Sequence, residues 1–120
     1  MIDCKEYLLN ITTKKIKFGL ERTKALLALC NNPEKKIFSV QLVGTNGKGS
    51  TSAMLANIIK QGNYTVGLYT SPHLIDYRER IQVNFNLIPH NVINSFINKY
   101  KKGIEKIKPS FFEIMTVLAV

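Results

Sequence analysis

A short glycine-rich stretch contains the residue types that could bind a phosphate group. In QLVGTNGKGSTSAML, Gly44, Gly47, Lys48 and Gly49 stand between an apolar run and a helical pattern. Glycine loses the most backbone freedom on folding, so three glycines in six positions indicate a sharp bend or a close approach to a ligand. Lysine offers a point charge to phosphate oxygens, and the hydroxyl residues at 50–52 could bind phosphate or Mg²⁺.

The flanking residues predict the elements that position this loop. Residues 37–43 are mostly apolar and β-branched, which is typical of a strand, and residues 64–70 predict a second strand. Residues 50–61 between them predict a helix that ends at Gly62, and the apolar stripe of this helix consists of Met54, Leu55, Ile58 and Ile59. The amides at a helix start lack intrahelical acceptors, and the helix dipole favours an anion there.

This order of elements is a βαβ unit, which builds a parallel sheet with a right-handed crossover. The predicted fold class is therefore α/β, the N-terminal part of a mostly parallel nucleotide-binding sheet flanked by helices. The spacing does not match the strict G-x-x-x-x-G-K-[ST] pattern, because it is two residues shorter and Gly49 separates the lysine from the hydroxyls. The alternative interpretation is a surface turn in which Ser50 is the N-cap of the helix.

Further helices are predicted on both sides of this unit. Residues 3–11 predict a short helix, and a second helical pattern, with Leu20, Thr23, Leu27 and either Ala28 or Cys30 on one face, ends at 31–33. Alternating residues at 81–86 predict a strand with a possible hairpin turn at 84–86. A helix over 90–107 is expected to turn these residues inward: Val92 or Ile93, Phe96, Ile97 and Tyr100. Another helix begins near Ser110 and reaches Val120 without a cap, so we expect residues 1–120 to be the N-terminal portion of an incomplete domain.

Composition narrows the class of protein. The chain has 120 residues, is 45% hydrophobic and 21% charged, and contains neither an apolar run of roughly 18 residues nor a signal peptide. We therefore expect a globular, cytoplasmic protein without a membrane partner, and a monomer. Cys4 and Cys30 have neither metal spacing nor a disulfide framework, so both are predicted to be reduced thiols. The net charge of +9 comes mostly from lysine and suits anionic small substrates, while nucleic-acid binding is the alternative.

Two residues outside the loop can each be interpreted either as functional or as structural. Ser71 begins a Ser-Pro-His loop at the end of the second predicted strand, where ligands bind in open α/β sheets, although Ser-Pro also favours a simple turn. Glu113 is the only acid in an apolar helix start, and a buried carboxylate needs a partner. That partner could be a metal ion, but Ser110-x-x-Glu113 is also the spacing of a capping box.

Four stretches together resemble one known family. GTNGKGST is similar to the phosphate loop of the Mur-ligase superfamily. YLLNITTKKIKFGLERTKALL, GLYTSPHLIDYRERIQVN and PSFFEIMTVLAV resemble its folate branch, folylpolyglutamate synthase and dihydrofolate synthase. LCNNPEK departs from the Gly-Asn-Pro turn of that branch, and VNFNLIP lacks a glycine often found there. Both departures lie outside the phosphate loop.

The resemblance implies an activity and a set of functional residues. It implies an ATP-dependent ligase that adds L-glutamate to dihydropteroate, to reduced folates or to both, through an acyl phosphate, with a C-terminal domain that is absent here. It implies Mg²⁺ ligands at Ser71 and Glu113. From their places in the chain we also expect substrate contacts at His73 and at Arg78 or Arg80, and a catalytic role for Lys48, whose charge would meet the terminal phosphates. The residues that the resemblance implies for ATP are Gly44, Thr45, Asn46, Gly47, Lys48, Gly49, Ser50 and Thr51.

Two other functions remain open at this point. One is a Mur-type ligase for a different carboxylate, and the other is a non-catalytic nucleotide- or nucleic-acid-binding module that uses the basic surface. The glutamate site of the family lies outside these residues, so we expect the 120 residues alone to have no ligase activity.

Overall fold

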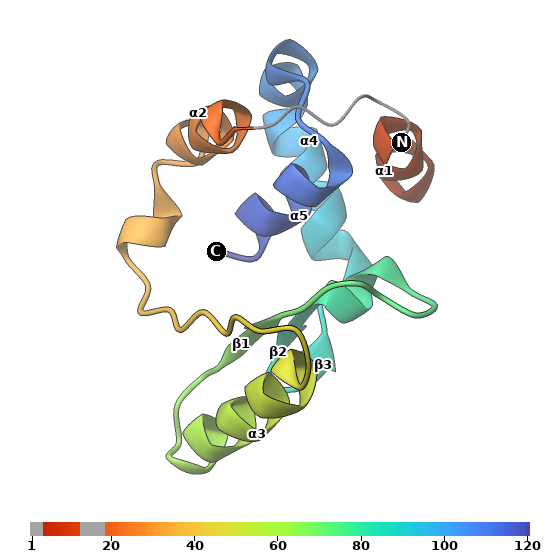
Figure 1. Ribbon diagram of the computed structural model, residues 1–120. Helices are drawn as coiled ribbons and strands as arrows, with labels where there is room; N and C mark the ends of the chain where they lie inside the picture. Colours follow the sequence, from red (N-terminus) through yellow and green to blue (C-terminus); the bar gives the residue numbers. More distant parts are fainter. Residues whose placement is uncertain (1–3, 13–18) are drawn as a thin grey trace. The chain divides into compact units, whose positions relative to one another are not determined.

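The computed structural model describes residues 4–12 and 19–120, which divide into two compact units (Figure 1). The first unit, the helical unit, extends over residues 1–37 and 90–120, and its described residues are mainly helical. It contains α1 (Cys4–Thr12), α2 (Glu21–Leu29), the 3-10 turn η1 (Pro33–Lys35), α4 (His90–Ile107) and α5 (Phe111–Leu118). The second unit, residues 38–89, contains α3 (Lys48–Gln61), β1 (Gly67–Tyr69), the 3-10 turn η2 (Tyr77–Arg80), β2 (Ile81–Val83) and β3 (Asn86–Leu87).

The helical unit is built around the apolar face of α4. Ile93, Ile97 and Ile104 recur at helical spacing and are all buried, and both α1 and α2 pack against α4 and α5. The predicted inward positions Ile93 and Ile97 are confirmed, whereas Val92 is exposed. Phe96 and Tyr100 are half-buried, and their rings pack against each other.

The predicted face of α2 is confirmed only in part, because Thr23 and Cys30 are half-buried but Ala28 is exposed. Leu26 is fully buried, while Leu20 is exposed and Leu27 is half-buried. Arg22 stands one helical turn before Leu26 and lies on the same face, where it reaches α5. The sequence pattern did not reveal this face, because an arginine is normally expected to point into solvent.

The structure describes the side chain of one of the two cysteines that were predicted to be reduced thiols. Cys30 is a free, half-buried thiol at the C-cap of α2, and burial raises its pKa above the ordinary value. The side chain of Cys4 lies outside the part of the chain that the structure describes.

The sheet unit holds three short antiparallel strands in the order β1-β2-β3, and α3 packs against β1. Leu68 pairs with Gln82, and Val83 pairs with Asn86 across the predicted hairpin turn. Asn84 and Phe85 form this turn with φ angles of 50° and 67°, as tight hairpin turns require. The hairpin is thereby confirmed.

The predicted strand at 37–43 is wrong, and the described residues show no parallel strand pairing. Residues 38–44 form no strand, and β1 pairs with the antiparallel β2 instead. The apolar composition supplied strand propensity, but a ladder also needs a partner edge, and none of the described residues offers one to this segment. Most of its side chains remain in solvent, with Phe38 95% and Val43 85% exposed, although Leu42 is half-buried.

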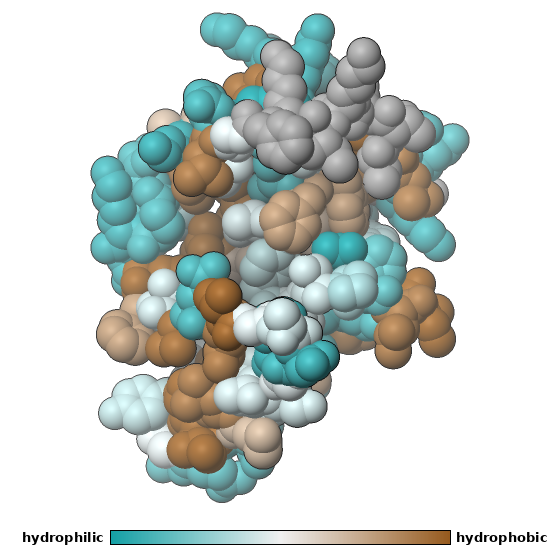
Figure 2. Space-filling model, in the orientation of Figure 1, coloured by the Kyte–Doolittle hydropathy of each residue, from teal (hydrophilic) through white to brown (hydrophobic). Residues whose placement is uncertain are grey.

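Apolar residues are therefore common on the surface of the described chain. Figure 2 shows brown, hydrophobic side chains between teal, hydrophilic ones on the face that it presents. The most exposed large apolar residues are Phe38, Val43, Leu74 and Ile75. Among the described residues, no helix has both the length and the apolar character to cross a membrane.

Candidate nucleotide-binding site

The glycine loop runs directly into the N-terminus of α3. Gly47 is the N-cap, with a left-handed φ of 75°, and Lys48 is the first residue of the helix. No side chain accepts a hydrogen bond from the first-turn amides at this cap, so they are open to an external acceptor. The helix begins two residues earlier than predicted, and the hypothesis that Ser50 is its N-cap is wrong.

Lys48 turns back over the loop that precedes it. Its Nζ donates a hydrogen bond of 2.6 Å to the carbonyl oxygen of Gly44, which closes the loop. Thr51 N donates to Gly47 O at 2.9 Å, and Ser52 Oγ donates to Gly49 O at 2.9 Å. The loop therefore gathers one ammonium group and the positive end of a helix dipole at a single solvent-exposed place.

The glycines leave open space beside this backbone. A Cβ atom added at Gly47 or Gly49 would meet nothing within 4 Å. The left-handed φ of Gly47 favours a glycine at this position. At position 49, by contrast, no nearby protein atom requires the residue to be a glycine. A ligand that approaches the backbone at Gly49 would explain it. Thr45 and Asn46 lie in the same exposed turn.

The loop after β1 brings together two of the residues predicted to contact substrate. Arg80 Nε donates to His73 Nδ1 at 2.9 Å, which leaves the proton of a neutral His73 ring on Nε2. Ser71 is exposed at the start of this loop, before a cis peptide bond to Pro72. The loop that the sequence singled out therefore presents a hydroxyl group and an imidazole, and the roles of Ser71 and His73 stay predictions.

Glu79 organises the same loop, although in the sequence it stands in a run of charged residues that is typical of a solvated loop, Asp76, Arg78, Glu79 and Arg80. Its carboxylate accepts hydrogen bonds from the amides of Asp76 at 2.7 Å, Leu74 at 2.8 Å and Ile75 at 3.0 Å. These bonds favour the charged form and lower the pKa of Glu79, with the Asp76 amide contributing most. The spacing Asp76-x-x-Glu79, which forms a capping box on η2, was the signal that could have found it.

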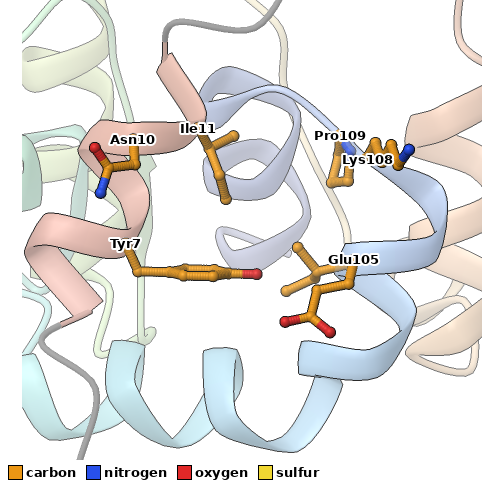
Figure 3. A pocket seen from close by; sticks show the side chains of 7 residues that line it. Tyr7, Asn10, Ile11, Glu105, Lys108 and Pro109 are labelled. Carbon is orange, nitrogen blue, oxygen red and sulfur yellow. The ribbon is translucent and has the colours of Figure 1, made fainter.

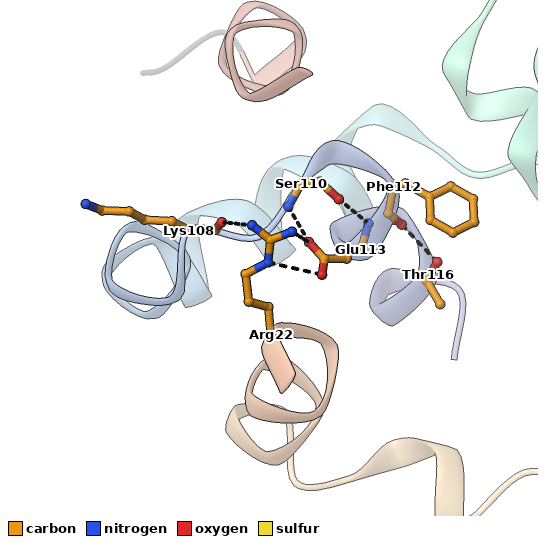
Figure 4. Close-up of polar contacts among 6 residues, drawn as sticks. All are labelled: Arg22, Lys108, Ser110, Phe112, Glu113 and Thr116. Atoms are coloured by element: carbon orange, nitrogen blue, oxygen red, sulfur yellow. Dashed lines mark hydrogen bonds and ion pairs between the residues drawn. The ribbon is translucent and has the colours of Figure 1, made fainter. Parts of the chain in front are cut away.

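Glu113 lies in a network of polar contacts at the start of α5 (Figure 4). It forms the predicted capping box, in which Ser110 N donates to Glu113 Oε2 at 2.6 Å and Glu113 N donates to Ser110 Oγ at 3.3 Å. Arg22 binds both carboxylate oxygens, with Nη2–Oε2 at 3.0 Å and Nε–Oε1 at 3.2 Å. Arg22 Nη1 also donates to the carbonyl oxygen of Lys108 at 3.2 Å. The capping interpretation is confirmed, and Arg22 is the partner that the sequence did not reveal.

The metal role of Ser71 and Glu113 stays a prediction. Ser71 lies in the sheet unit and Glu113 lies in the helical unit. Within residues 4–12 and 19–120, no three His, Cys, Asp or Glu side chains form a group that could hold a metal ion. The donor chemistry still fits Mg²⁺, because hydroxyl and carboxylate oxygens are hard ligands. Glu113 receives three donors and a carboxylate accepts about four, so one acceptor position is left.

Two pockets lie elsewhere in the units. The helical unit has a half-open pocket of about 280 Å³ (Figure 3), lined by Tyr7, Asn10, Ile11, Ile104, Glu105, Lys108 and Pro109. The sheet unit has a shallow hollow between α3 and Phe85, lined by Ala53, Met54, Asn57 and Phe85. The glycine loop lines neither of these pockets, and residues 44–50 are all exposed, so that site is an open cradle.

Comparison with known proteins adds family relationships to this geometry. No protein-family model matches the chain. A dihydrofolate synthase/folylpolyglutamate synthase from Bacillus subtilis is 41% identical over 110 residues, covering 87% of this chain and 26% of the relative. The Thermotoga maritima folylpolyglutamate synthase structure is 37% identical with a TM-score of 0.80, covering 98% of this chain and 28% of that one. Escherichia coli FolC in complex with ADP is 31% identical with a TM-score of 0.82, covering 95% and 28%.

The chain is a homologue of the dihydrofolate synthases and folylpolyglutamate synthases. The similarity extends along nearly the whole chain, which agrees with the four resembling stretches of sequence. The chain spans about a quarter of the length of these relatives.

Proposed function

We propose that residues 1–120 are the N-terminal portion of the ATP-binding domain of a ligase. This ligase would add L-glutamate to dihydropteroate, to reduced folates or to both. Its glutamate site would lie in parts of the protein outside these residues, so the 120-residue chain alone would be inactive. The homology to folylpolyglutamate synthases supports the proposal.

The observation that carries the proposal is the cradle at the N-terminus of α3. Its first-turn amides have no side-chain cap, Gly47 and Gly49 leave room beside the backbone, and Lys48 sits at the helix start. Each of these features suits the phosphates of a nucleotide. E. coli FolC, to which the chain is similar, has been solved with ADP, and also with DHPP and ADP.

In the proposed reaction, a carboxylate oxygen of the pterin substrate takes the γ-phosphoryl group of ATP, and ADP leaves. The amine of glutamate then attacks the acyl carbon, and phosphate leaves as the amide forms. Phosphoryl transfer depends mainly on positioning and charge neutralisation. Lys48 would exchange its bond to Gly44 O for a phosphate oxygen, while the loop amides hold the other oxygens.

The remaining predicted site residues have supporting roles in this proposal. Ser71 and the free acceptor position of Glu113 would hold Mg²⁺, which when bound neutralises phosphate charge. His73 would present Nε2–H to the substrate carboxylate or the pterin, with its ring oriented by Arg80.

The test is ADP release by the full-length protein with ATP, Mg²⁺ and L-glutamate, adding dihydropteroate or a reduced folate in turn. We expect turnover with at least one of them, and no turnover by the 120-residue chain. Lys48→Gln should reduce turnover by roughly 100-fold or more, because a donor to the transferring phosphoryl group is lost. Lys60→Gln is the matched control, because Lys60 lies near the other end of α3, where it contacts Asn84 O and the ring of Phe85.

Each of the other outcomes would contradict a particular part of the proposal. If the protein turns over a nucleotide-linked peptidoglycan precursor but no pterin substrate, the proposed substrate is wrong and the ligase acts on a different carboxylate. Glutamate-dependent ADP release by the 120 residues alone would refute the proposal that the site is incomplete. Absence of nucleotide binding, together with DNA affinity that falls about a thousandfold between 50 and 200 mM salt, would indicate a nucleic-acid-binding module.

A further inference from the structure

Three consecutive backbone amides converge on the carboxylate of Glu79. Leu74 N binds Oε2 at 2.8 Å, while Ile75 N and Asp76 N bind Oε1 at 3.0 and 2.7 Å. Glu79 follows these residues in the chain, so its side chain reaches back over the loop that leads into η2. A single side chain thereby satisfies the backbone donors of half the loop at 71–76.

Packing does little to fix this part of the loop. Leu74 and Ile75 are 91% and 93% exposed, so their side chains are not held by a core. By contrast, η2 packs against β2, and Tyr77 within η2 is buried. Glu79 therefore connects an anchored turn to a segment whose backbone shape depends mainly on hydrogen bonds.

The neighbouring charges strengthen the arrangement. Asp76 Oδ1 accepts from Arg78 N at 2.9 Å, and its Oδ2 forms an ion pair with Arg78 at 2.6 Å. Arg80 holds His73 at 2.9 Å. Each of the two arginines that flank Glu79 thus binds a residue of the same loop. The run that reads as solvated charge in the sequence is a connected scaffold around the residues that follow Ser71.

We propose that Glu79 is a positioning residue that fixes the backbone of the loop at 71–76 so that Ser71 and His73 keep their places during catalysis. The catalytic part of this inference rests on the proposed ligase function. The role requires a carboxylate, because all three partners are donors. A glutamine offers one acceptor oxygen and an NH₂ group that would face amide donors.

The first test measures amide hydrogen exchange at Leu74, Ile75 and Asp76 in the protein and in Glu79→Gln. We expect exchange at these amides to become roughly tenfold faster or more, because they lose a charged acceptor. The amides of Ala56 and Ile88, which belong to the same unit but lie outside η2, report whether the fold is intact and should keep their protection. Glu105→Gln is the matched control, because Glu105 is exposed on α4 and has a long contact of 3.8 Å to Lys101.

The second test compares kcat and KM of the ligase reaction. Glu79→Gln should lower kcat by roughly 10- to 100-fold, as expected when the support of a catalytic ligand is removed, with KM for ATP almost unchanged. Glu105→Gln should leave both constants unchanged. Equal exchange in Glu79→Gln and the wild type would overturn the inference, and so would faster exchange with an unchanged kcat.

The two measurements also separate this inference from the proposed function. If the wild-type protein lacks ligase activity, the proposed function and the catalytic role of Glu79 both fail. The exchange data would still decide whether Glu79 holds the loop.

Discussion

Replacing Arg22 by methionine should destabilise the helical unit by about 2–3 kcal/mol. Methionine keeps the straight apolar stem of arginine and removes the guanidinium group. Glu113 would then keep its bond to Ser110 N but lose both contacts to Arg22. The carbonyl oxygen of Lys108 would lose a donor as well.

The magnitude follows from the exposure of the two side chains, which is 19% for Arg22 and 11% for Glu113. Removing one partner of a fully buried pair costs about 3–5 kcal/mol, whereas an exposed pair contributes about 0–1 kcal/mol. These side chains lie near the buried limit but remain in contact with water. A value somewhat below the buried range, about 2–3 kcal/mol, is therefore expected.

The assay is urea unfolding followed by circular dichroism for the wild type, Arg22→Met, Glu113→Gln and the double variant. In the double variant no buried charge is left unpaired, so its loss should be about 1–2 kcal/mol smaller than the sum of the single losses. Lys101→Met removes an exposed i,i+4 pair with a separation of 3.8 Å and should cost less than about 0.5 kcal/mol. A loss below about 0.5 kcal/mol for Arg22→Met would refute the argument that this pair is buried and coupled.

Three further predictions concern the loops and the core. Gly47→Ala should lower the free energy of unfolding by about 1–2 kcal/mol, because its φ is 75°, whereas Gly49→Ala should change stability little. Calorimetric titration with ADP should show weaker binding for both variants. An unchanged ADP affinity in Gly49→Ala would contradict a ligand that approaches the backbone at residue 49. Leu26→Ala should lower the free energy of unfolding by about 3 kcal/mol, since its side chain is fully buried, and a loss under about 1 kcal/mol would contradict the packing of α2. The folded-state pKa of Glu79 lies below the ordinary 4.5, so its stabilisation of the 71–76 loop should be complete above pH 4.5 and disappear as the pH falls further. Amide exchange at Leu74 and Ile75, measured over a pH series and corrected for the intrinsic exchange rate, would detect this loss. Loss of protection already at pH 6 would contradict this assignment.

Features that depend on residues close together in the chain could be predicted from the sequence. The glycine loop before α3, the hairpin turn at 84–85 and the capping box of Ser110 and Glu113 all form within a few residues. Their geometry follows from backbone preferences and from side chains that reach their own neighbours. The family relationship was also readable, because it depends on motifs and their order along the chain.

Only the tertiary structure decided the contacts between distant segments. Arg22 and Glu113 are 91 residues apart, and no local pattern indicates that one neutralises the other. The antiparallel pairing of β1 with β2, and the exposed state of the apolar segment 38–43, depend on which partner edges are present. A strand's composition sets its propensity, but its pairing is a property of two segments, and a buried charge is stable only beside the particular partner that the fold delivers.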